Sequence, residues 1–378
     1  MKVLILMPMA TQRGGGELML WQLLEHADSS MVEWVVVFFE KGPLVAEVEE
    51  LGVTTYVVET GRLRQLHRFV RAVASIRDLI HKEDPDLVFS WSGKPHLYAA
   101  PAAAGTGVPT AWYQLGCPQG RHLSWMDRLV TLLPTSCVFV LSQFGEEGQQ
   151  HLWPSRPTRL VYPSADRDRF DPTSMPSPRT TRAQLDLPLD GPLIGIVGRL
   201  QHWKGIHVFV EAMAQVHESH PEAYGVVVGG KHDLEPDYPE VVQRLIEKHR
   251  LEDRILTVGY QKDIPHWMQA MDIIVHASDH EPFGIVIIEA LALGKPVIAG
   301  AEGGPAEIIS HGHDGLLVPF GDAGQLADAI RHLLDDSVHA DRIAEKGQLR
   351  AADFSHSRYA TSFVSQIRAL LQGNHQTK

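Results

Sequence analysis

Two glutamates stand out in the stretch DHEPFGIVIIEALALGKPVIAG, which runs from Asp279 to Gly300. Glu281 comes just before a helical pattern that is apolar nearly all round, and Glu289 lies inside it, eight positions later. Burying an unpaired carboxylate is costly, so both side chains need hydrogen-bond donors. Each ionised carboxylate accepts two hydroxyl hydrogens, as the diol of a sugar or a ribose would offer. In the alternative interpretation the helix dipole favours Glu281 and Glu289 faces solvent, but an apolar helix indicates burial.

A second group of residues could hold phosphate. In GIVGRLQHWKG, Arg199 and Lys204 bracket a short loop that leads into a helix at Gly205. Arginine offers phosphate a planar fork, lysine adds a point charge, and a helix N-terminus adds free amides. Gly284 would free the amides of its helix in the same way. A solvated loop with two surface cations is the competing interpretation of the Arg199 and Lys204 segment, and both stay open.

The segment TQRGGGE, from Thr11 to Glu17, follows the first apolar run of the chain. Gly15 and Gly16, beside Glu17, would let a backbone approach a ligand closely. The segment is not a Walker loop, because no Gly-Lys-Ser/Thr follows, and it lacks the G-x-G-x-x-G spacing of dinucleotide-binding folds. A flexible turn is the other interpretation.

Short apolar runs alternate with longer amphipathic segments along the whole chain. The first half predicts strands at Val3–Met7, Glu33–Phe39, Thr54–Val58, Asp86–Trp91, Thr110–Gln114 and Cys137–Leu141. The second half predicts strands at Leu193–Val197, Gly225–Val228, Ile255–Val258, Ile273–His276, Pro296–Ala299 and Leu316–Val318. Helical patterns lie between them, for example at Glu17–His26, Leu63–His81 and Leu97–Ala104. Continuously apolar strands separated by helices indicate parallel sheets that are covered on both faces.

The predicted fold class is therefore α/β, with two doubly wound Rossmann-like domains facing a central cleft. We expect the first domain at 1–165, a proline-rich linker at 166–190 and the second domain at 191–355. A last helix, at about 356–378, would cross back to the first domain. Ligands of such sheets bind at the carboxyl ends of the strands. The run Asp166–Asp168 (DRD) falls in the expected linker, so we interpret it as a solvated turn and predict no metal site.

Composition narrows the function. The 378 residues exceed one ordinary core, and the formal net charge of -12 argues against a nucleic-acid partner. Cys117 and Cys137 are too few for a disulfide framework and suit a reducing compartment. The opening MKVLILMPMA is typical of a first buried strand rather than a signal peptide, and no apolar stretch reaches the roughly 20 residues of a membrane span. We therefore expect a cytoplasmic protein. Its oligomeric state stays open.

Several of these runs together resemble a known family. The run E-P-F-G-x-x-x-x-E-A-x-A-x-G-x-P-V-I-A from Glu281 is similar to the E-x7-E motif of retaining glycosyltransferases of family 4, which have the GT-B fold. G-R-L-x-x-x-K-G at Gly198–Gly205 and GGPAEII with GHDGLLVPFGD within Gly303–Asp322 match the same family, as does the early glycine-rich loop. The resemblance covers nearly the whole chain and is most specific in the second half.

The resemblance implies transfer of a sugar from a nucleotide-sugar with retention at the anomeric carbon, without a divalent metal or other cofactor. It places the donor sugar at Glu281, and Glu289 would hold the ribose. Arg199 and Lys204 would neutralise the leaving diphosphate. The remaining implied contacts are the backbone of Phe283, Gly284 and Ile285 at the sugar or phosphates, and Gly259–Tyr260 at the nucleobase. A UDP-sugar is the first donor expected and GDP-mannose the next, while the acceptor, lipid-linked or a glycan or small molecule, is not identified.

One position departs from the family. Members often carry a histidine after the fifth strand of the first domain, where this chain has Leu115 in WYQLGCP. Leucine cannot hydrogen-bond, so Gln114, His96 or Lys94 would have to substitute, or the donor sugar sits differently. For His96 a loop histidine without a role is the more economical interpretation. A sugar-nucleotide-binding protein without catalysis is therefore a second hypothesis, and a nucleotide-sugar epimerase of similar fold is a third.

A basic helical segment suggests one further partner. Between Arg62 and Lys82 there are six lysines or arginines and one acid, Asp78, in an otherwise acidic protein. Its apolar stripe would most simply pack on the sheet and leave a solvated basic face. The sharper hypothesis is a peripheral contact with an anionic membrane that carries a lipid-linked acceptor.

Overall fold

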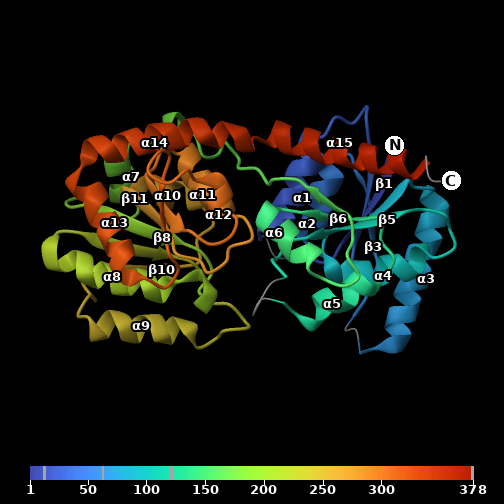
Figure 1. The fold of residues 1–378 in the computed structure, drawn as a ribbon, viewed down its shortest axis with the longest axis horizontal. Coiled ribbons are helices and arrows are strands. Elements are labelled where there is room, and N and C mark those ends of the chain that lie inside the picture. Colours follow the sequence, from blue (N-terminus) through green and yellow to red (C-terminus); the bar gives the residue numbers. More distant parts are fainter. Residues whose placement is uncertain (12–13, 62–63, 119–122, 376–378) are drawn as a thin grey trace. The chain divides into compact units, whose positions relative to one another are not determined.

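The computed structural model describes residues 1–11, 14–61, 64–118 and 123–375. The chain divides into two compact units (Figure 1). The first unit comprises Met1–Ser164 and His356–Lys378, and the second comprises Ala165–Ser355. Each unit is built on one parallel sheet, so the predicted fold class of two Rossmann-like α/β domains is confirmed.

The first sheet has the strand order β3-β2-β1-β4-β5-β6-β7, and all its strand pairs are parallel. Its strands are β1 (Lys2–Met7), β2 (Glu33–Phe38), β3 (Thr54–Val57), β4 (Leu87–Ser90), β5 (Thr110–Gln114), β6 (Cys137–Val140) and β7 (Thr158–Leu160). The central strands are buried along nearly their whole length, because helices cover both faces. Only β7, a short strand, was absent from the sequence prediction.

Helices α1 (Gly15–His26), α2 (Pro43–Glu50), α3 (Leu66–Glu83), α4 (Gly93–Ala103), α5 (Trp125–Leu132) and α6 (Gln143–Gln150) connect these strands. α4 begins four residues before the predicted start at Leu97. The prediction stopped short of Pro95, but Pro95 lies in the first turn, where no amide hydrogen bond is lost.

The chain returns to the first unit through α15 (His356–His375), as predicted, and α15 packs against α1. Phe363 of α15 stands among the rings of Phe89, Trp91, Tyr113 and Phe139, with ring centroids 5.2 to 5.8 Å from its own. This aromatic core explains why the last helix belongs to the first unit.

The second sheet has the order β10-β9-β8-β11-β12-β13 and is also parallel. Its strands are β8 (Leu193–Val197), β9 (Tyr224–Val228), β10 (Ile255–Gly259), β11 (Ile273–His276), β12 (Val297–Gly300) and β13 (Leu316–Val318). The helices are α7 (Pro178–Gln184), α8 (Ile206–Ser219), α9 (Tyr238–Lys248), α10 (Ile264–Ala270), α11 (Ile285–Ala292), α12 (Pro305–Ile308), α13 (Ala323–Asp335) and α14 (Ser337–Ala351). Short 3-10 turns are η2 (Pro172–Ser174), η3 (His202–Lys204) and η4 (Ala352–Phe354).

The segment 166–190, expected to be a linker, is part of the second unit and contains α7. Ser177 caps the helix at the amide of Thr180, and Pro178 occupies its first turn. Arg182 then anchors α7 to the sheet, because its buried guanidinium donates to Ala270 O at 2.8 Å and pairs with Asp272. The four prolines of this segment suggested an irregular chain, but the Ser177-Pro178 pair was a helix-start signal.

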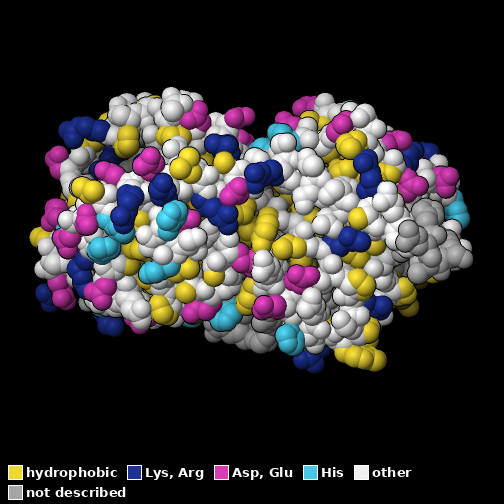
Figure 2. Space-filling view, turned by 45° about the horizontal axis from the view of Figure 1, so that its top comes forward, with side chains coloured by type: hydrophobic (Ala, Val, Ile, Leu, Met, Phe, Trp, Pro, Cys, Tyr) yellow, Lys and Arg dark blue, Asp and Glu magenta, His cyan; other side chains and the backbone are white. Residues whose placement is uncertain are grey.

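Charges of both signs are interspersed over the face of the second unit seen in Figure 2, and no continuous basic surface appears there. Among the described residues, no helix combines the length and the apolarity that a membrane crossing needs.

Candidate functional site

The candidate site of the second unit forms where the strand order reverses. β8 and β11 are neighbours at this point, and the chain leaves them toward opposite edges of the sheet. Ligands of doubly wound sheets bind outside the carboxyl ends of the two strands at such a point. The loop after β8 carries Arg199 and Lys204, and the loop after β11 carries Glu281. The topology therefore brings together residues that are about eighty positions apart in the sequence.

Glycines let these loops approach one another. Gly205, at φ +69° between η3 and α8, has no room for a side chain, because a Cβ atom would lie 1.9 Å from Ala277 O. A Cβ on Gly229 would lie 1.7 Å from Gly198 O, so the loop after β9 also presses on the loop after β8. The amide of Asp279 donates to Trp203 O at 2.7 Å and ties η3 to the loop after β11.

Lys204, Glu281 and His276 form a buried charged cluster at this edge. Lys204 Nζ lies 2.6 Å from Glu281 Oε2, and His276 Nε2 lies 3.1 Å from the same oxygen. The exposed fractions of the Lys204 and Glu281 side chains are only 17% and 11%. Burial alone would raise the pKa of Glu281, but Lys204 and His276 outweigh it and hold the pKa well below its usual range. Glu281 is therefore an ionised, oriented acceptor.

The loop that carries Glu281 is fixed by the segment after β12. Gly304 N donates to Glu281 O at 2.8 Å, and a Cβ on Gly304 would lie 2.3 Å from Phe283 Cα. The Phe283 side chain is buried against the Phe354 ring, at a centroid distance of 5.6 Å. Gly284, at φ +110°, then turns the chain into α11, whose first residue is Ile285. The segment Gly303–Pro305 thus packs against the loop Glu281–Gly284 and fixes its position.

Glu289 lies inside α11 and its residue surface is 8% exposed. Burial raises its pKa to about 8, and Arg169 opposes the rise while Asp166 adds to it. The DRD segment, interpreted from the sequence as a solvated turn, therefore lies close enough to α11 to act on Glu289. Burial therefore favours the neutral form of Glu289.

Three other candidates of the second unit, Arg199, Gly259 and Tyr260, are exposed. Arg199 is exposed directly after β8. Gly259, at φ +69°, ends β10 and accepts the Gly229 amide at 2.9 Å. Tyr260 follows with 68% of its surface exposed, beside Gly230. An exposed aromatic ring next to a glycine is a platform on which a flat ring could stack.

In the first unit, Gly15, Gly16 and Glu17 begin α1 at the carboxyl edge of the sheet. Glu17 Oε2 accepts the Gly14 amide at 2.6 Å, so the glutamate already caps its own helix. Gly16 O accepts from the indole of Trp91 at 2.7 Å. Leu115 packs on the same loop, with its methyl carbon 3.2 Å from the place of a Cβ on Gly16.

Two expected substitutes for the missing histidine have other partners. Gln114 is buried, donates to Asp127 Oδ1 at 3.1 Å and accepts from the Gly116 amide at 3.3 Å. His96 is fully buried, its Nε2 lies 3.1 Å from Pro134 O, and its ring stacks on Trp112. Burial lowers the pKa of His96 to about 4. His96 is therefore a neutral core histidine, and the substrate-binding role expected for it stays a prediction.

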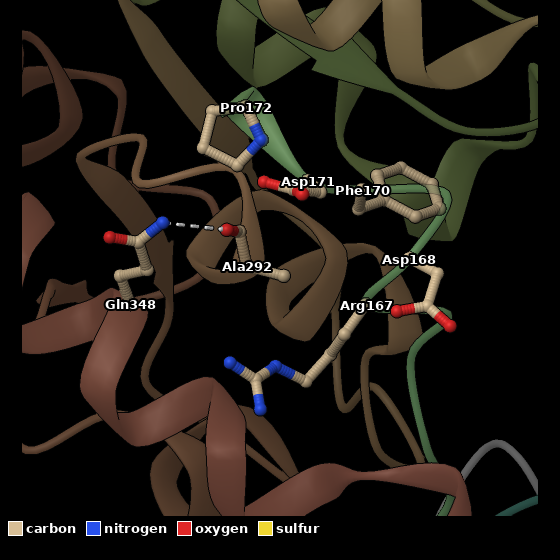
Figure 3. A pocket seen from close by; sticks show the side chains of 7 residues that line it. All are labelled: Arg167, Asp168, Phe170, Asp171, Pro172, Ala292 and Gln348. Atoms are coloured by element: carbon tan, nitrogen blue, oxygen red, sulfur yellow. Dashed lines mark hydrogen bonds between the residues drawn. The ribbon is translucent and has the colours of Figure 1, made fainter. Parts of the chain in front are cut away.

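A cavity of about 320 Å³ in the second unit is lined by residues other than Lys204, Glu281 and His276. Arg167, Asp168, Phe170, Asp171, Pro172, Ala292 and Gln348 line it (Figure 3). Ala292 is the last residue of α11, so the cavity opens at the opposite end of that helix from Gly284. The partial negative charge of a helix C-terminus disfavours phosphate there.

His276 is the one member of the cluster that the sequence analysis did not select. It is the last residue of β11, a strand predicted correctly, and its exposed fraction is 3%. A polar residue that ends a buried strand at the carboxyl edge was the available signal, but one histidine among 21 carried little weight.

Two parallel sheets of this topology, with cations, carboxylates and a helix N-terminus at the reversal point of the second one, define the GT-B class of glycosyltransferases. A family model for "Glycosyltransferase Family 4" matches residues 13–169, and one for "Glycosyl transferases group 1" matches residues 178–350. The chain therefore belongs to the GT-B glycosyltransferases, with a family 4 segment followed by a group 1 segment.

Curated relatives carry related names. A D-inositol 3-phosphate glycosyltransferase of Corynebacterium urealyticum is 33% identical over 215 residues, which is 56% of this chain and 51% of the relative. A lipopolysaccharide core biosynthesis mannosyltransferase, LpsB of Rhizobium meliloti, is 26% identical over 67% of this chain and 71% of the relative. The chain spans about half the length of the first of these relatives.

Solved structures agree with the fold. Anabaena Alr3699/HepE in complex with UDP and glucose superimposes with a TM-score of 0.86 and 26% identity, over 97% of this chain and 99% of that one. Sucrose-phosphate synthase from Thermosynechococcus elongatus has a TM-score of 0.80 at 24% identity, over 98% and 99% of the two chains, and shows the fold alone.

Proposed function

We propose that this chain transfers a sugar from a nucleotide diphosphate sugar to a hydroxyl acceptor, with retention at the anomeric carbon and without a metal. The observation that carries the proposal is the buried cluster of Lys204, Glu281 and His276 at the reversal point of the second sheet. A UDP-sugar is the first candidate donor, because HepE, similar over nearly the full chain, is described in complex with UDP-glucose. GDP-mannose is the next.

The leaving diphosphate is the group that most needs stabilisation. Arg199 and Lys204 supply cations, and the first amides of α11, at Gly284 and Ile285, add the positive end of the helix. Preorganised charges of this kind stabilise a developing anion without reorganising. Protein cations thus take the part that a divalent metal plays in other transferases.

The carboxylates would orient the donor. Lys204 and His276 both contact Oε2 of Glu281, and no described residue hydrogen-bonds Oε1. Oε1 is therefore available to a hydroxyl of the sugar. Glu289 would accept the ribose diol, and Tyr260 would stack on the base. We assign the acceptor to the first unit and keep a lipid-linked acceptor, a glycan and a small molecule as alternatives.

A thermal-shift screen against UDP-, GDP- and ADP-sugars tests donor binding, since a ligand of the native state raises the melting temperature. The wild-type protein is then incubated with the binding donor, and release of the nucleoside diphosphate is followed. Slow hydrolysis without acceptor, lost in Glu281→Gln, supports a transferase. Binding without turnover would instead support a non-catalytic protein, and an altered sugar nucleotide an epimerase.

We also propose a peripheral contact with an anionic membrane through the start of α3. Ile76 and Ile80 of α3 are buried in the core, as the apolar stripe predicted, but Leu66 and Val70 of the same stripe are exposed. Arg77 is turned back to the carbonyls of Ala102 and Ala104, at 3.2 and 2.7 Å, so the basic face is narrower than expected.

The first two turns of α3 carry the features that suit a lipid surface. Leu66 and Val70 are 70% and 58% exposed, and the arginines around them, Arg64, Arg68 and Arg71, are exposed too. Arg62, also expected here, lies outside the described residues. Apolar side chains flanked by cations are typical of interfacial helices.

Sedimentation with vesicles of phosphatidylcholine and phosphatidylglycerol tests this contact. Binding at low salt should weaken in the double variant Leu66→Ser/Val70→Ser and on vesicles of phosphatidylcholine alone. Leu234→Ser is the matched control, because Leu234 is 82% exposed in the second unit. Wild-type protein that stays in the supernatant at low salt removes the proposal.

A further inference from the structure

His276 occupies a place that neither the sequence motifs nor the matched families explain. It ends β11, a central strand of the second sheet, and its ring is 3% exposed. Nε2 lies 3.1 Å from Glu281 Oε2 and 3.3 Å from Ser278 Oγ. An ionised carboxylate only accepts hydrogen bonds, so Nε2 carries a hydrogen that it donates to Glu281.

The surroundings of the other ring nitrogen, Nδ1, indicate how many protons the imidazole carries. Nδ1 is buried and has no hydrogen-bond partner among the described residues. A neutral ring with its hydrogen on Nε2 leaves only an acceptor unpaired, whereas a charged ring would bury an unpaired N–H as well. His276 is thus arranged as a fixed donor to Glu281.

Lys204 and His276 both contact Oε2 of Glu281, but their side chains differ in how far they can move. Lys204 has a flexible stem, and its ammonium lies 4.0 Å from the centre of the Trp203 ring at the edge of the loop. A diphosphate would draw that ammonium toward itself, because a phosphate is the more highly charged partner. The imidazole is held by the strand and cannot follow. When Lys204 turns to phosphate, His276 is the donor that stays with Glu281.

We infer that His276 is a positioning residue of the transfer reaction, which holds the Glu281 carboxylate ionised and aimed at the donor sugar while Lys204 engages the leaving diphosphate. This inference rests on the proposed function. His276 touches neither the sugar nor the phosphates in this scheme, and it acts through Glu281 alone.

Two variants separate the hydrogen bond from simple packing. His276→Leu keeps an apolar volume and removes the donor, whereas His276→Gln offers an amide N–H at nearly the position of Nε2. We expect kcat to fall about 10- to 100-fold in His276→Leu, with a much smaller change in the KM of the donor. His276→Gln should recover most of the loss, and Ser278→Ala should be close to wild type.

The pH profile gives a readout that a merely structural role would not move. The side chains that act on Glu281 are Lys204 from η3, which is charged, and His276 from β11, which donates a hydrogen bond. Without His276 the pKa of Glu281 rises, so the acid limb of the kcat profile should move to higher pH in His276→Leu and return toward wild type in His276→Gln. An unmoved acid limb with a wild-type kcat overturns the inference.

A titration without turnover keeps this test independent of the proposed function. The carboxyl carbon of Glu281 is followed by NMR in 13C-glutamate-labelled protein, assigned by its loss in Glu281→Gln. We expect the pKa of Glu281 to be higher in His276→Leu than in wild type and intermediate in His276→Gln. Equal titration in all three overturns the inference, whether or not sugar is transferred. A shifted titration in a protein that turns over no nucleotide-sugar would overturn the proposed function, while the hydrogen bond by which His276 holds Glu281 ionised would stand.

Discussion

Lys204→Ala is the perturbation whose consequences the structure defines best. The variant removes the nearest cation of Glu281, at 2.6 Å, from a pair whose side chains are 17% and 11% exposed. Breaking a buried pair by removing one partner is destabilising because the other charge stays buried, by about 3–5 kcal/mol. For a unit of this size that corresponds to a loss of roughly 6–20 °C in melting temperature.

The same variant should also slow the reaction. Removing one preorganised group that stabilises a developing anion costs roughly 2.7–4 kcal/mol of barrier, or about two to three orders of magnitude in rate. Release of nucleoside diphosphate at saturating donor measures the rate, and calorimetric unfolding of the second unit measures the stability. A Lys204→Ala protein with wild-type rate and stability refutes the reasoning.

A second substitution separates the loss of stability from the loss of rate. Lys204→Ala/Glu281→Gln buries no charge, so it should regain much of the lost stability while its activity stays low.

The stability of the wild-type protein should also depend on pH, because the pKa of Glu281 is depressed in the folded state. Its ionisation stabilises the folded wild-type protein above the unfolded pKa of about 4.3, and this contribution is lost as pH falls further. The double variant should lack this acid-dependent loss.

Three other predictions follow from the same site. Arg199→Ala should lose about two to three orders of magnitude in rate but keep its melting temperature, because Arg199 is exposed, and a joint loss of both would contradict its role at the phosphates. Binding of UDP at pH 7 should release a fraction of a proton, because the pKa of Glu289 is raised to about 8 and a ribose diol favours its ionised form. Titration calorimetry in two buffers should show this release in wild type and not in Glu289→Gln. Gly304→Ala should abolish turnover with the unit still folded, because its Cβ would lie 2.3 Å from the chain behind Glu281, and full activity would show that the loop tolerates displacement.

Much of the fold could be predicted from the sequence. Strands such as β1 and β8 are buried along nearly their whole length, so they are apolar at almost every position. The misjudged segments are those where tertiary contacts override local composition. α7 forms in a proline-rich stretch because Arg182 is bound by the sheet, and α4 starts early because a proline in a first turn costs no hydrogen bond.

Site residues could be predicted from the sequence only where a reactive residue type stands in a recognisable motif. Glu281, Lys204 and Arg199 stand in dense, specific runs, and the topology carries them to one edge of the second sheet. His276 could not be found in this way, because its importance is a distance to a carboxylate five residues away and not a motif. His96 shows the opposite case, in which the sequence gives no sign of burial. It stands among glycine and lysine near the start of a helix, but helical geometry turns its ring into the core.

The first unit explains what the leucine at position 115 means for the chemistry. Polar groups near the carboxyl edge of its sheet are engaged internally: Glu17 caps α1, and Gln114 holds Asp127. Leu115 packs on the glycine loop and offers no hydrogen bond. Of the candidate substitutes only Lys94 is exposed, at the start of α4. In the proposed mechanism, stabilisation of the transition state would therefore fall chiefly on the cations and amides of the second unit, and the orientation of Glu281 would matter correspondingly more.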